Sequence, residues 1–219
     1  SLKISLRDSY IKMLSKECFD VLVIGGGPAG IQAAREAGEA GERVLLVEQM
    51  PWLGGSIEKP TTDADTLAAM GNVTVMTRTT AFGQYDGNCF ALVERVADHL
   101  PVPPEGQPRQ RSWVARAKRV VFAVGAHERP LVFCKNDLPG VMLASAARDY
   151  ANRFAVRPGG RAVIFTNNDS AYETAIEFKK NGIDPLVVDV RRNIESSVIR
   201  EAKNLNIKIK FSHAIANTK

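Results

Sequence analysis

Cysteine, histidine and long apolar stretches are scarce in this sequence of 219 residues. The three cysteines, Cys18, Cys89 and Cys134, lie far apart, so no pair has the C-x-x-C spacing of a redox disulfide, a zinc site or an iron–sulfur site. Unpaired cysteines are typical of a reducing compartment, which favours a cytoplasmic location. No apolar run reaches the roughly 18 residues that a membrane-spanning helix needs, so we expect no membrane segment.

Aromatic residues make up only 7% of the chain, and its net charge of +5 is modest for this length. The basic residues are scattered, without the stripe of basic and aromatic side chains that binds nucleic acid. The three histidines, His99, His127 and His213, are dispersed, and we expect His127 to be a linker residue rather than a catalytic base. No catalytic triad, carboxylate pair or metal cluster stands out. We therefore predict no nucleic-acid partner and no metal site, and we assign no catalytic residue.

The clearest positive pattern is a strand, a turn, a helix and a second strand in succession. Asp20–Ile24 and Arg43–Val47 are short aliphatic runs typical of buried parallel strands, and Ile31–Ala40 is a helix rich in small residues. The segment between Gly25 and Gly30 reads Gly-Gly-Gly-Pro-Ala-Gly. A G-x-G-x-x-G spacing inside such a βαβ unit indicates a dinucleotide-binding domain.

Each glycine of this fingerprint has a steric role. Gly25 permits the tight turn, Gly27 leaves no side chain to hold a pyrophosphate off the backbone, and Gly30 lets the helix pack close to the strand. The free amides and the dipole at the helix start then face the phosphates. Glu48 follows Gly30 by 18 residues and can accept hydrogen bonds from both ribose hydroxyls. Because a carboxylate there repels a 2′-phosphate, the pattern favours NAD or FAD over NADP.

The rest of the chain predicts an α/β fold of two tandem Rossmann-like domains with a β-meander insertion. Residues 1–18 form a lead-in, in which the spacing from Tyr10 onward is compatible with one or two helical turns. Residues 19–130 form the first dinucleotide-binding domain with its meander, and residues 131–219 form a second, incomplete Rossmann-like domain. The further predicted elements are a helix at 63–70, strands at 72–79, 82–85, 89–96, 113–117, 119–124, 161–166, 185–190 and 207–211, and helices at 170–181 and 194–204.

The second βαβ unit has a degenerate fingerprint. After the strand Arg161–Thr166 the turn reads Thr-Asn-Asn-Asp-Ser-Ala, without glycine at any fingerprint position. Side chains there hold the backbone away from a pyrophosphate, and Asp169 adds a negative charge. Asp169 or Ser170 is expected to cap the following helix. Asp189 remains at the end of the next strand, so we predict that this unit keeps the fold and has lost nucleotide binding.

Two further segments are expected to pass close to the cofactor: the loop Trp52–Ser56, with its glycine pair, and the strand end Val121–Ala126. The predicted cofactor-binding residues are Gly25, Gly27, Pro28, Ala29, Gly30, Glu48, Gln49, Gly54, Gly55, Ser56, Ala81, Gly125 and Ala126.

Several segments together resemble the α subunit of heterotetrameric sarcosine oxidase. The distinctive ones are Thr-Thr-Ala-Phe-Gly at 79–83, Gly-Ala-His-Glu-Arg-Pro at 125–130 and Asn-Asp-Leu-Pro-Gly-Val-Met at 136–142. The resemblance extends over nearly all of residues 18–190. The α subunits of opine and dye-linked proline dehydrogenases and of hydrogen cyanide synthase look similar in less detail.

This resemblance implies a complex that oxidises sarcosine (N-methylglycine) to glycine with O₂ and passes the methyl carbon to tetrahydrofolate. It implies β, γ and δ partner subunits, an amine-oxidising flavin in the β subunit and a covalent flavin at the α/β interface, so FMN and FAD belong to the complete complex only. The α subunit would bind NAD through Gly25, Gly27, Gly30 and Glu48. Family α subunits are several times longer, so we expect this chain to be a fragment that is inactive alone.

The residues themselves leave the cofactor open, because the fingerprint recognises the ADP half that FAD and NAD share. The resemblance favours NAD, with FAD as the alternative at the same site. An independent FAD-dependent NAD(P)H oxidoreductase is a second interpretation, but it needs a working second fingerprint and usually a redox cysteine pair. Two further interpretations are an opine or proline dehydrogenase α subunit and a scaffold with a vestigial nucleotide site.

Overall fold

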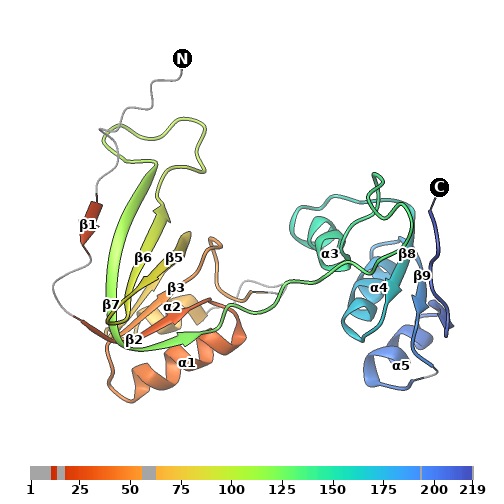
Figure 1. Ribbon diagram of the computed structural model, residues 1–219, viewed down its shortest axis with the longest axis horizontal. Helices are drawn as coiled ribbons and strands as arrows, with labels where there is room; N and C mark the ends of the chain where they lie inside the picture. Colours follow the sequence, from red (N-terminus) through yellow and green to blue (C-terminus); the bar gives the residue numbers. More distant parts are fainter. Residues whose placement is uncertain (1–10, 14–17, 56–62, 193, 219) are drawn as a thin grey trace. The chain divides into compact units, whose positions relative to one another are not determined.

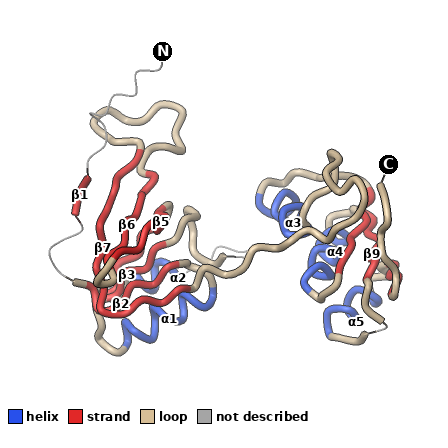
Figure 2. The backbone as a smooth tube through the Cα atoms, in the orientation of Figure 1, coloured by secondary structure: helices blue, strands red, loops and turns tan. Residues whose placement is uncertain are grey.

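A computed structural model describes residues 11–13, 18–55, 63–192 and 194–218 of the chain (Figure 1). The chain divides into two compact units, Ser1–Ala126 and His127–Lys219. Helices and strands are combined in each unit, which confirms the predicted α/β class (Figure 2).

The first unit is built on a parallel sheet whose centre carries the glycine turn. Its strands lie in the order β4 (Val73–Met76), β3 (Val44–Val47), β2 (Phe19–Ile24) and β7 (Gln110–Phe122), and each neighbouring pair is parallel. Because parallel strands end at the same edge, the turn after β2 lies beside the carboxyl ends of β3 and β7. The fold therefore places the glycine turn between two other strand ends.

Both faces of this parallel sheet are buried, which explains the continuous apolar runs of its strands. Val21 and Val23 face α1 (Pro28–Glu39) and α2 (Asp63–Ala68), which cover one side. Leu22 and Ile24 alternate with them and pack on the other side. Their neighbours there come from the β-meander: Phe90, Leu92, Ala115 and Ala117.

The meander consists of β5 (Thr79–Tyr85), β6 (Cys89–Arg95) and β7, with antiparallel neighbours. Sequence predicted separate strands at 113–117 and 119–124, but β7 is a single strand of 13 residues. The strand stays continuous because it changes partner near its middle. Residues 110–116 pair with β6, and pairing with β2 starts at Ala117.

The prediction of helical turns from Tyr10 onward is wrong for Ile11–Met13. These residues form the short strand β1, which is parallel to Ser112–Val114 of β7. The edge of β7 before Ala117 is not used by β2, so it is available to β1. Tyr10 and residues 14–17 lie outside the described residues.

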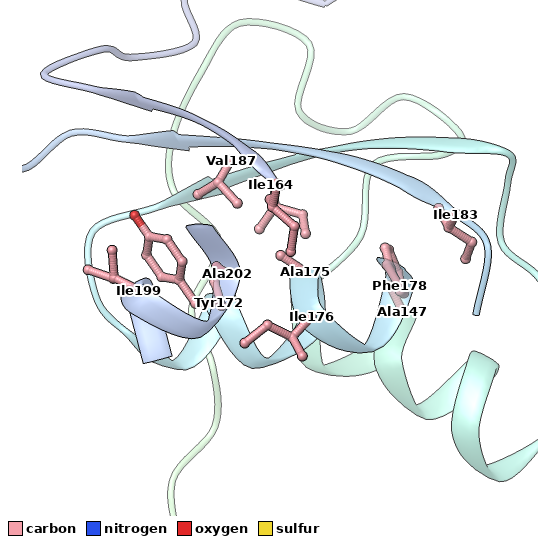
Figure 3. Packing of buried hydrophobic residues seen from close by; sticks show 12 residues of the cluster. Ala147, Ile164, Tyr172, Ala175, Ile176, Phe178, Ile183, Val187, Ile199 and Ala202 are labelled. Carbon is pink, nitrogen blue, oxygen red and sulfur yellow. The ribbon is translucent and has the colours of Figure 1, made fainter. Parts of the chain in front are cut away.

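The second unit has the three predicted strands, which are parallel and lie in the order β10–β9–β8. These are β8 (Arg161–Thr166), β9 (Asp184–Asp189) and β10 (Lys208–Phe211). The helices α4 (Ser170–Lys180) and α5 (Ser197–Asn204) pack on one face of this sheet. Figure 3 shows their shared core, with Tyr172 and Ile199 near one end and Phe178 and Ile183 near the other.

One helix of this unit was not predicted, and the start of another was predicted at the wrong residue. The helix α3 (Ala144–Arg153) was not predicted, since Ala147 is its only fully buried residue and Leu143 cannot cap it with a polar side chain. The last helix starts at Ser197 instead of residue 194, because the Ser196 hydroxyl accepts a hydrogen bond from the Ile199 amide at 3.4 Å.

Candidate functional site

The glycine turn after β2 is held tightly against the end of β7. Gly25 has φ of +105°, and a Cβ atom placed on it would lie 2.3 Å from the Ala123 carbonyl oxygen. A Cβ on Gly30 would lie 1.8 Å from the Gly25 carbonyl oxygen. Both positions therefore require glycine: the first for backbone conformation and space, and the second for close packing of α1 on the turn.

Gly27 differs from these two because space is open beside it. Among the described residues, a Cβ on Gly27 would meet only the Gly55 Cα, at 3.9 Å, and Gly27 has φ of −75°, which any amino acid can adopt. No fold constraint demands glycine here, whereas a ligand lying on the backbone would. This is the observation that fits a pyrophosphate to the turn.

The start of α1 supplies donors for such an anion. Gly27 is the N-cap, Pro28 is the first helical residue and lacks an amide hydrogen, and the first intrahelical bond runs from the Ile31 amide to the Gly27 carbonyl oxygen at 2.9 Å. The amides of Ala29 and Gly30 are thus in the turn that has no intrahelical acceptor. Together with the helix dipole, they favour a phosphate group.

Glu48 lies beside the turn, directly after β3, and is 7% exposed. Its Oε2 accepts a hydrogen bond from the Gly26 amide at 2.6 Å, and its Oε1 accepts one from the Met50 amide at 2.7 Å. A carboxylate offers about four acceptor positions. The two backbone bonds fix the group while leaving capacity for the hydroxyls of a ribose.

The glycine-pair loop closes over the same turn. The Gly54 amide donates to the Gly26 carbonyl oxygen at 2.8 Å, and a Cβ on Gly55 would lie 3.0 Å from the Gly27 Cα. Gly54 and Gly55 both have positive φ, and Leu53 is buried beneath the turn. The structure therefore brings this loop to the fingerprint, although Ser56 lies outside the described residues.

The other predicted site residues lie around this centre. Gln49 is exposed next to Glu48, and Ala81 is half-buried against the meander core. Gly125 and Ala126 are exposed beyond the end of β7. The residue of this segment that meets the turn is Ala123, which faces both Gly25 and Gly30. Ala123 belongs to the predicted segment Val121–Ala126, and cofactor binding by Gly125 and Ala126 stays a prediction.

Sequence reasoning also missed a clamp on the residues around Glu48. The Thr79 amide donates to the Glu48 carbonyl oxygen at 2.8 Å, and the Arg78 amide donates to the Met50 carbonyl oxygen at 2.9 Å. The Arg95 guanidinium donates to the Gln49 carbonyl oxygen at 2.5 Å. These contacts hold the carbonyl groups of residues 48–50, and no local sequence pattern predicts such a long-range relation.

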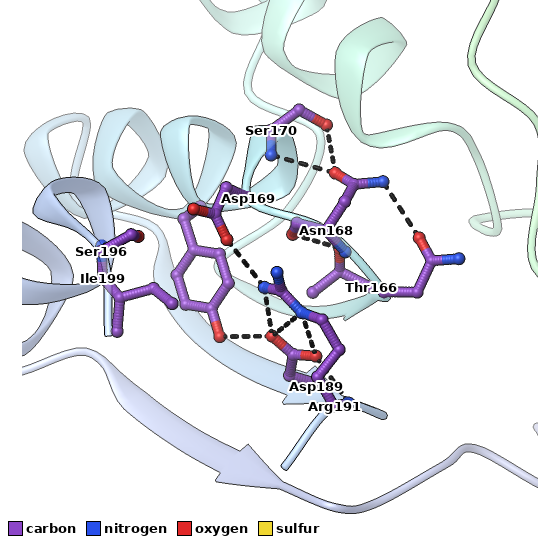
Figure 4. A network of polar contacts seen from close by, with 10 residues as sticks. Thr166, Asn168, Asp169, Ser170, Asp189, Arg191, Ser196 and Ile199 are labelled. Atoms are coloured by element: carbon purple, nitrogen blue, oxygen red, sulfur yellow. Dashed lines mark hydrogen bonds and ion pairs between the residues drawn. The ribbon is translucent and has the colours of Figure 1, made fainter. Parts of the chain in front are cut away.

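The corresponding turn of the second unit has a different construction. Asp169 occupies the N-cap position of α4, but its side chain makes no capping bond, contrary to the prediction. The Asn168 side chain does this instead, since its Oδ1 accepts from the Ser170 amide at 3.0 Å. The Asp169 carboxylate turns towards Arg191, with which it forms an ion pair of 2.8 Å (Figure 4).

Glu128, within the segment 125–130, has a role that the sequence did not reveal. Its carboxylate accepts hydrogen bonds from the amides of Ala144, at 3.2 Å, and Ser145, at 2.9 Å. Both amides belong to the first turn of α3. Glu128 thus caps a helix that lacks a local cap, whereas His127 beside it is exposed.

Possible metal ligands do not gather in the described part of the chain. There, histidine, cysteine and acidic residues form no group of three that could hold a metal ion. None of the helices in the described ranges has the length and apolar character needed to span a bilayer.

Comparison with known proteins relates the chain to a family and to longer subunits. Residues 20–123 match the family of FAD dependent oxidoreductases. The sarcosine oxidase α subunit from Corynebacterium sp. (strain U-96) is 40% identical over 214 residues, covering 91% of this chain and 22% of that subunit. The α subunit from Rhizobium meliloti (strain 1021) is 46% identical over 186 residues, covering 78% of this chain and 19% of that subunit.

Among solved structures, the L-proline dehydrogenase from P. horikoshii matches with a TM-score of 0.58 and 28% sequence identity. The match covers 86% of this chain and 38% of that one. In each of these comparisons the chain corresponds to a minor part of a longer protein.

Proposed function

We propose, from the homology of this chain with part of the sarcosine oxidase α subunit, that its first unit binds the ADP half of a dinucleotide. In this proposal the chain is the dinucleotide-binding part of a complex that oxidatively demethylates sarcosine to glycine with O₂ and tetrahydrofolate. The observation that carries it is the open backbone at Gly27, next to the anchored carboxylate of Glu48.

The roles of the residues follow from their placement. Gly27 gives the pyrophosphate access to the backbone, and the amides of Ala29 and Gly30 donate to it. The Glu48 carboxylate accepts from the ribose hydroxyls. The two described backbone donors to Glu48 are neutral amides, and in this proposal its carboxylate repels a 2′-phosphate. The site is therefore suited to NAD or FAD rather than NADP.

NAD is the proposed ligand, because the resemblance described above implies it, and FAD is the alternative at the same site. The match of residues 20–123 to the FAD dependent oxidoreductases supports the alternative. Both ligands present the same ADP half to Gly27 and Glu48. The nicotinamide or isoalloxazine ring that the bound dinucleotide carries would supply hydride-transfer chemistry.

Amine oxidation is assigned to other parts of the complex. We propose β, γ and δ subunits as partners, with FMN and FAD bound in the complete assembly only. We assign no catalytic residue to this chain, whose own residues bind and orient the dinucleotide in this proposal. A cytoplasmic location is part of the proposal, because Cys18, Cys89 and Cys134 are free thiols.

The ligand is identified by two measurements on the purified chain. Denaturation followed by an absorbance spectrum shows whether a flavin is released. Titration calorimetry with ADP-ribose, NAD⁺, NADP⁺ and FAD then ranks the ligands. We expect ADP-ribose and NAD⁺ to bind and NADP⁺ to bind much more weakly. A released flavin would replace NAD by FAD, and failure of ADP-ribose to bind would overturn the site.

The assignment to a larger complex has its own test. We expect the chain alone to oxidise neither sarcosine nor NAD(P)H with an artificial electron acceptor, with or without added FAD. Oxidation of sarcosine by the isolated chain would contradict its role as one part of a complex. Flavin-dependent oxidation of NAD(P)H would favour the alternative of an independent reductase.

A further inference from the structure

The acid at the end of β9 is the counterpart of Glu48 in the second unit, and it is more fully engaged. Asp189 is completely buried. The first interaction is the same in the two units: the Arg191 amide donates to Asp189 Oδ1 at 2.9 Å, as the Met50 amide donates to Glu48. In both units the donor is therefore the second residue after the acid.

The two units differ in what fills the remaining acceptor positions. In place of a backbone amide such as that of Gly26, Asp189 Oδ2 accepts from the Tyr172 hydroxyl at 2.8 Å. The Arg191 side chain folds back over the same carboxylate, with Nη2 at 2.8 Å from Oδ2 and Nε at 3.0 Å from Oδ1. A bidentate guanidinium of this kind saturates a carboxylate.

The same guanidinium reaches the turn before α4. Arg191 Nη2 lies 2.8 Å from Asp169 Oδ1, so a single cation contacts both the strand-end acid and the turn (Figure 4). In the first unit these two elements are joined directly, by the bond from Gly26 to Glu48, and the side of Gly27 stays open. In the second unit an arginine side chain stands between them.

We propose that Arg191 is an internal replacement for a nucleotide in the second unit: its guanidinium closes this unit to dinucleotides and joins β9 to the turn before α4. We call the contacts of Arg191 with Asp189 and Asp169 the lock. Asp189 holds the guanidinium in place through its bidentate contact. The chain consequently binds one dinucleotide, in its first unit.

The two ion-pair partners Arg191 and Asp189 differ in exposure, so loss of one is not equivalent to loss of the other. Arg191 is partly exposed, with 22% of its side chain accessible, whereas the Asp189 side chain has no exposure. Loss of the arginine leaves a buried carboxylate without its cation, which is costly. Loss of the carboxylate charge leaves an arginine that can turn to water. Loss of the Arg191 side chain should therefore destabilise the second unit much more than loss of the Asp189 charge.

The test uses Arg191→Gln, Asp189→Asn and the double variant, with Arg192→Gln as a matched control. Arg192 is exposed and is adjacent in sequence, so its variant removes the same charge without touching Asp189. Both tryptophans, Trp52 and Trp113, belong to the first unit, so their fluorescence follows that unit alone. Hydrogen exchange of residues 161–189 follows the second unit.

Arg191→Gln should accelerate exchange over residues 161–189 and lower the melting temperature of the second unit by roughly 10 °C or more, leaving tryptophan fluorescence unchanged. Arg192→Gln should resemble the parent chain. Asp189→Asn combined with Arg191→Gln should recover at least half of the loss, because no buried charge remains. If Arg191→Gln behaves like Arg192→Gln, or if the double variant is no more stable than Arg191→Gln, the lock is disproved.

Ligand protection supplies an independent arm. NAD⁺ or FAD should leave hydrogen exchange at residues 166–191 of the parent chain unchanged. Protection there by either dinucleotide would overturn the proposal. None of these outcomes depends on binding in the first unit, so failure of the lock and failure of the proposed function are separable.

Discussion

The amide of Gly26 donates a hydrogen bond of 2.6 Å to Oε2 of Glu48. This bond joins the glycine turn after β2 to the acid after β3, so the two elements that recognise the phosphates and the ribose are fixed relative to each other. The second carboxylate oxygen is held by the Met50 amide at 2.7 Å. The site is thus preorganised for its ligand, which reduces the ordering cost of binding.

Glu48→Gln should weaken ADP-ribose binding and relax selectivity between NAD⁺ and NADP⁺. The NH2 of the glutamine cannot accept a hydrogen bond, so in place of one carboxylate oxygen it loses a ribose contact or faces the Gly26 or Met50 amide. Bonds to charged groups contribute about 1.5–3 kcal/mol, which corresponds to roughly a 10- to 150-fold loss of affinity. Calorimetric titration measures the affinity for ADP-ribose, and Glu39→Gln on the exposed side of α1 is the control. Unchanged affinity in Glu48→Gln would show that the Glu48 carboxylate does not contact the ligand.

Gly27→Val should abolish dinucleotide binding without unfolding the first unit. The position has open space and φ of −75°, so the fold tolerates a side chain there while the pyrophosphate does not. Gly160→Val is the matched control, because space around Gly160 is also open and the residue lies in the second unit. Titration with ADP-ribose gives the affinity and tryptophan fluorescence reports the fold. Equal loss of binding in both variants would contradict the steric argument.

Asp169→Ala should leave binding in the first unit unchanged, in contrast to Gly27→Val. A loss of affinity comparable to that of Gly27→Val would mean that the second unit takes part in binding.

The parts of the molecule that sequence predicted are those governed by local spacing. Asp20–Ile24 and the fingerprint specify strand, turn and helix within a short segment, and both were located correctly. The strand β1 at Ile11–Met13 was not foreseen, since it exists only because distant β7 offers an edge. The clamp of Arg95 on the Gln49 carbonyl has the same long-range origin.

The helix α3 illustrates a second limit of sequence reasoning. Its exposed surface is compatible with a loop, and its cap comes from Glu128, which lies 16 residues before Ala144. Capping patterns are recognisable only when the cap is adjacent to the helix. Likewise, Asp169 or Ser170 was expected to cap α4, but the Asp169 carboxylate pairs with Arg191, and the Asn168 side chain accepts from the Ser170 amide instead.

Glu128→Ala should destabilise α3 selectively. The carboxylate satisfies two amides in the first turn and interacts favourably with the helix dipole, so we expect a loss of about 1 kcal/mol. Hydrogen exchange of residues 144–153 should become faster, while exchange in α4 and α1 stays the same. Glu105→Ala, in the exposed loop of the first unit, is the control. If exchange in α3 does not change, the cap does not contribute to its stability.

Acid should destabilise the second unit through its buried carboxylate, Asp189. Burial alone would raise the pKa of Asp189, but the hydrogen bonds from Arg191 and Tyr172 outweigh it, and the pKa is lowered. Hydrogen bonding from Ser196 and Arg191 also lowers the pKa of Asp169. A lowered folded-state pKa gives stability that is complete above the unfolded value of about 3.9 and is lost as the pH falls through the folded value.

The unfolding free energy of the second unit should therefore be constant from about pH 7 to pH 5 and decline below roughly pH 4. Hydrogen exchange of residues 161–189 measured across this range follows the decline, and tryptophan fluorescence monitors the first unit in parallel. Asp189→Asn should flatten the profile, because the group that gains protons on unfolding is absent. Retention of the full slope in Asp189→Asn would assign the acid sensitivity to carboxylates other than Asp189.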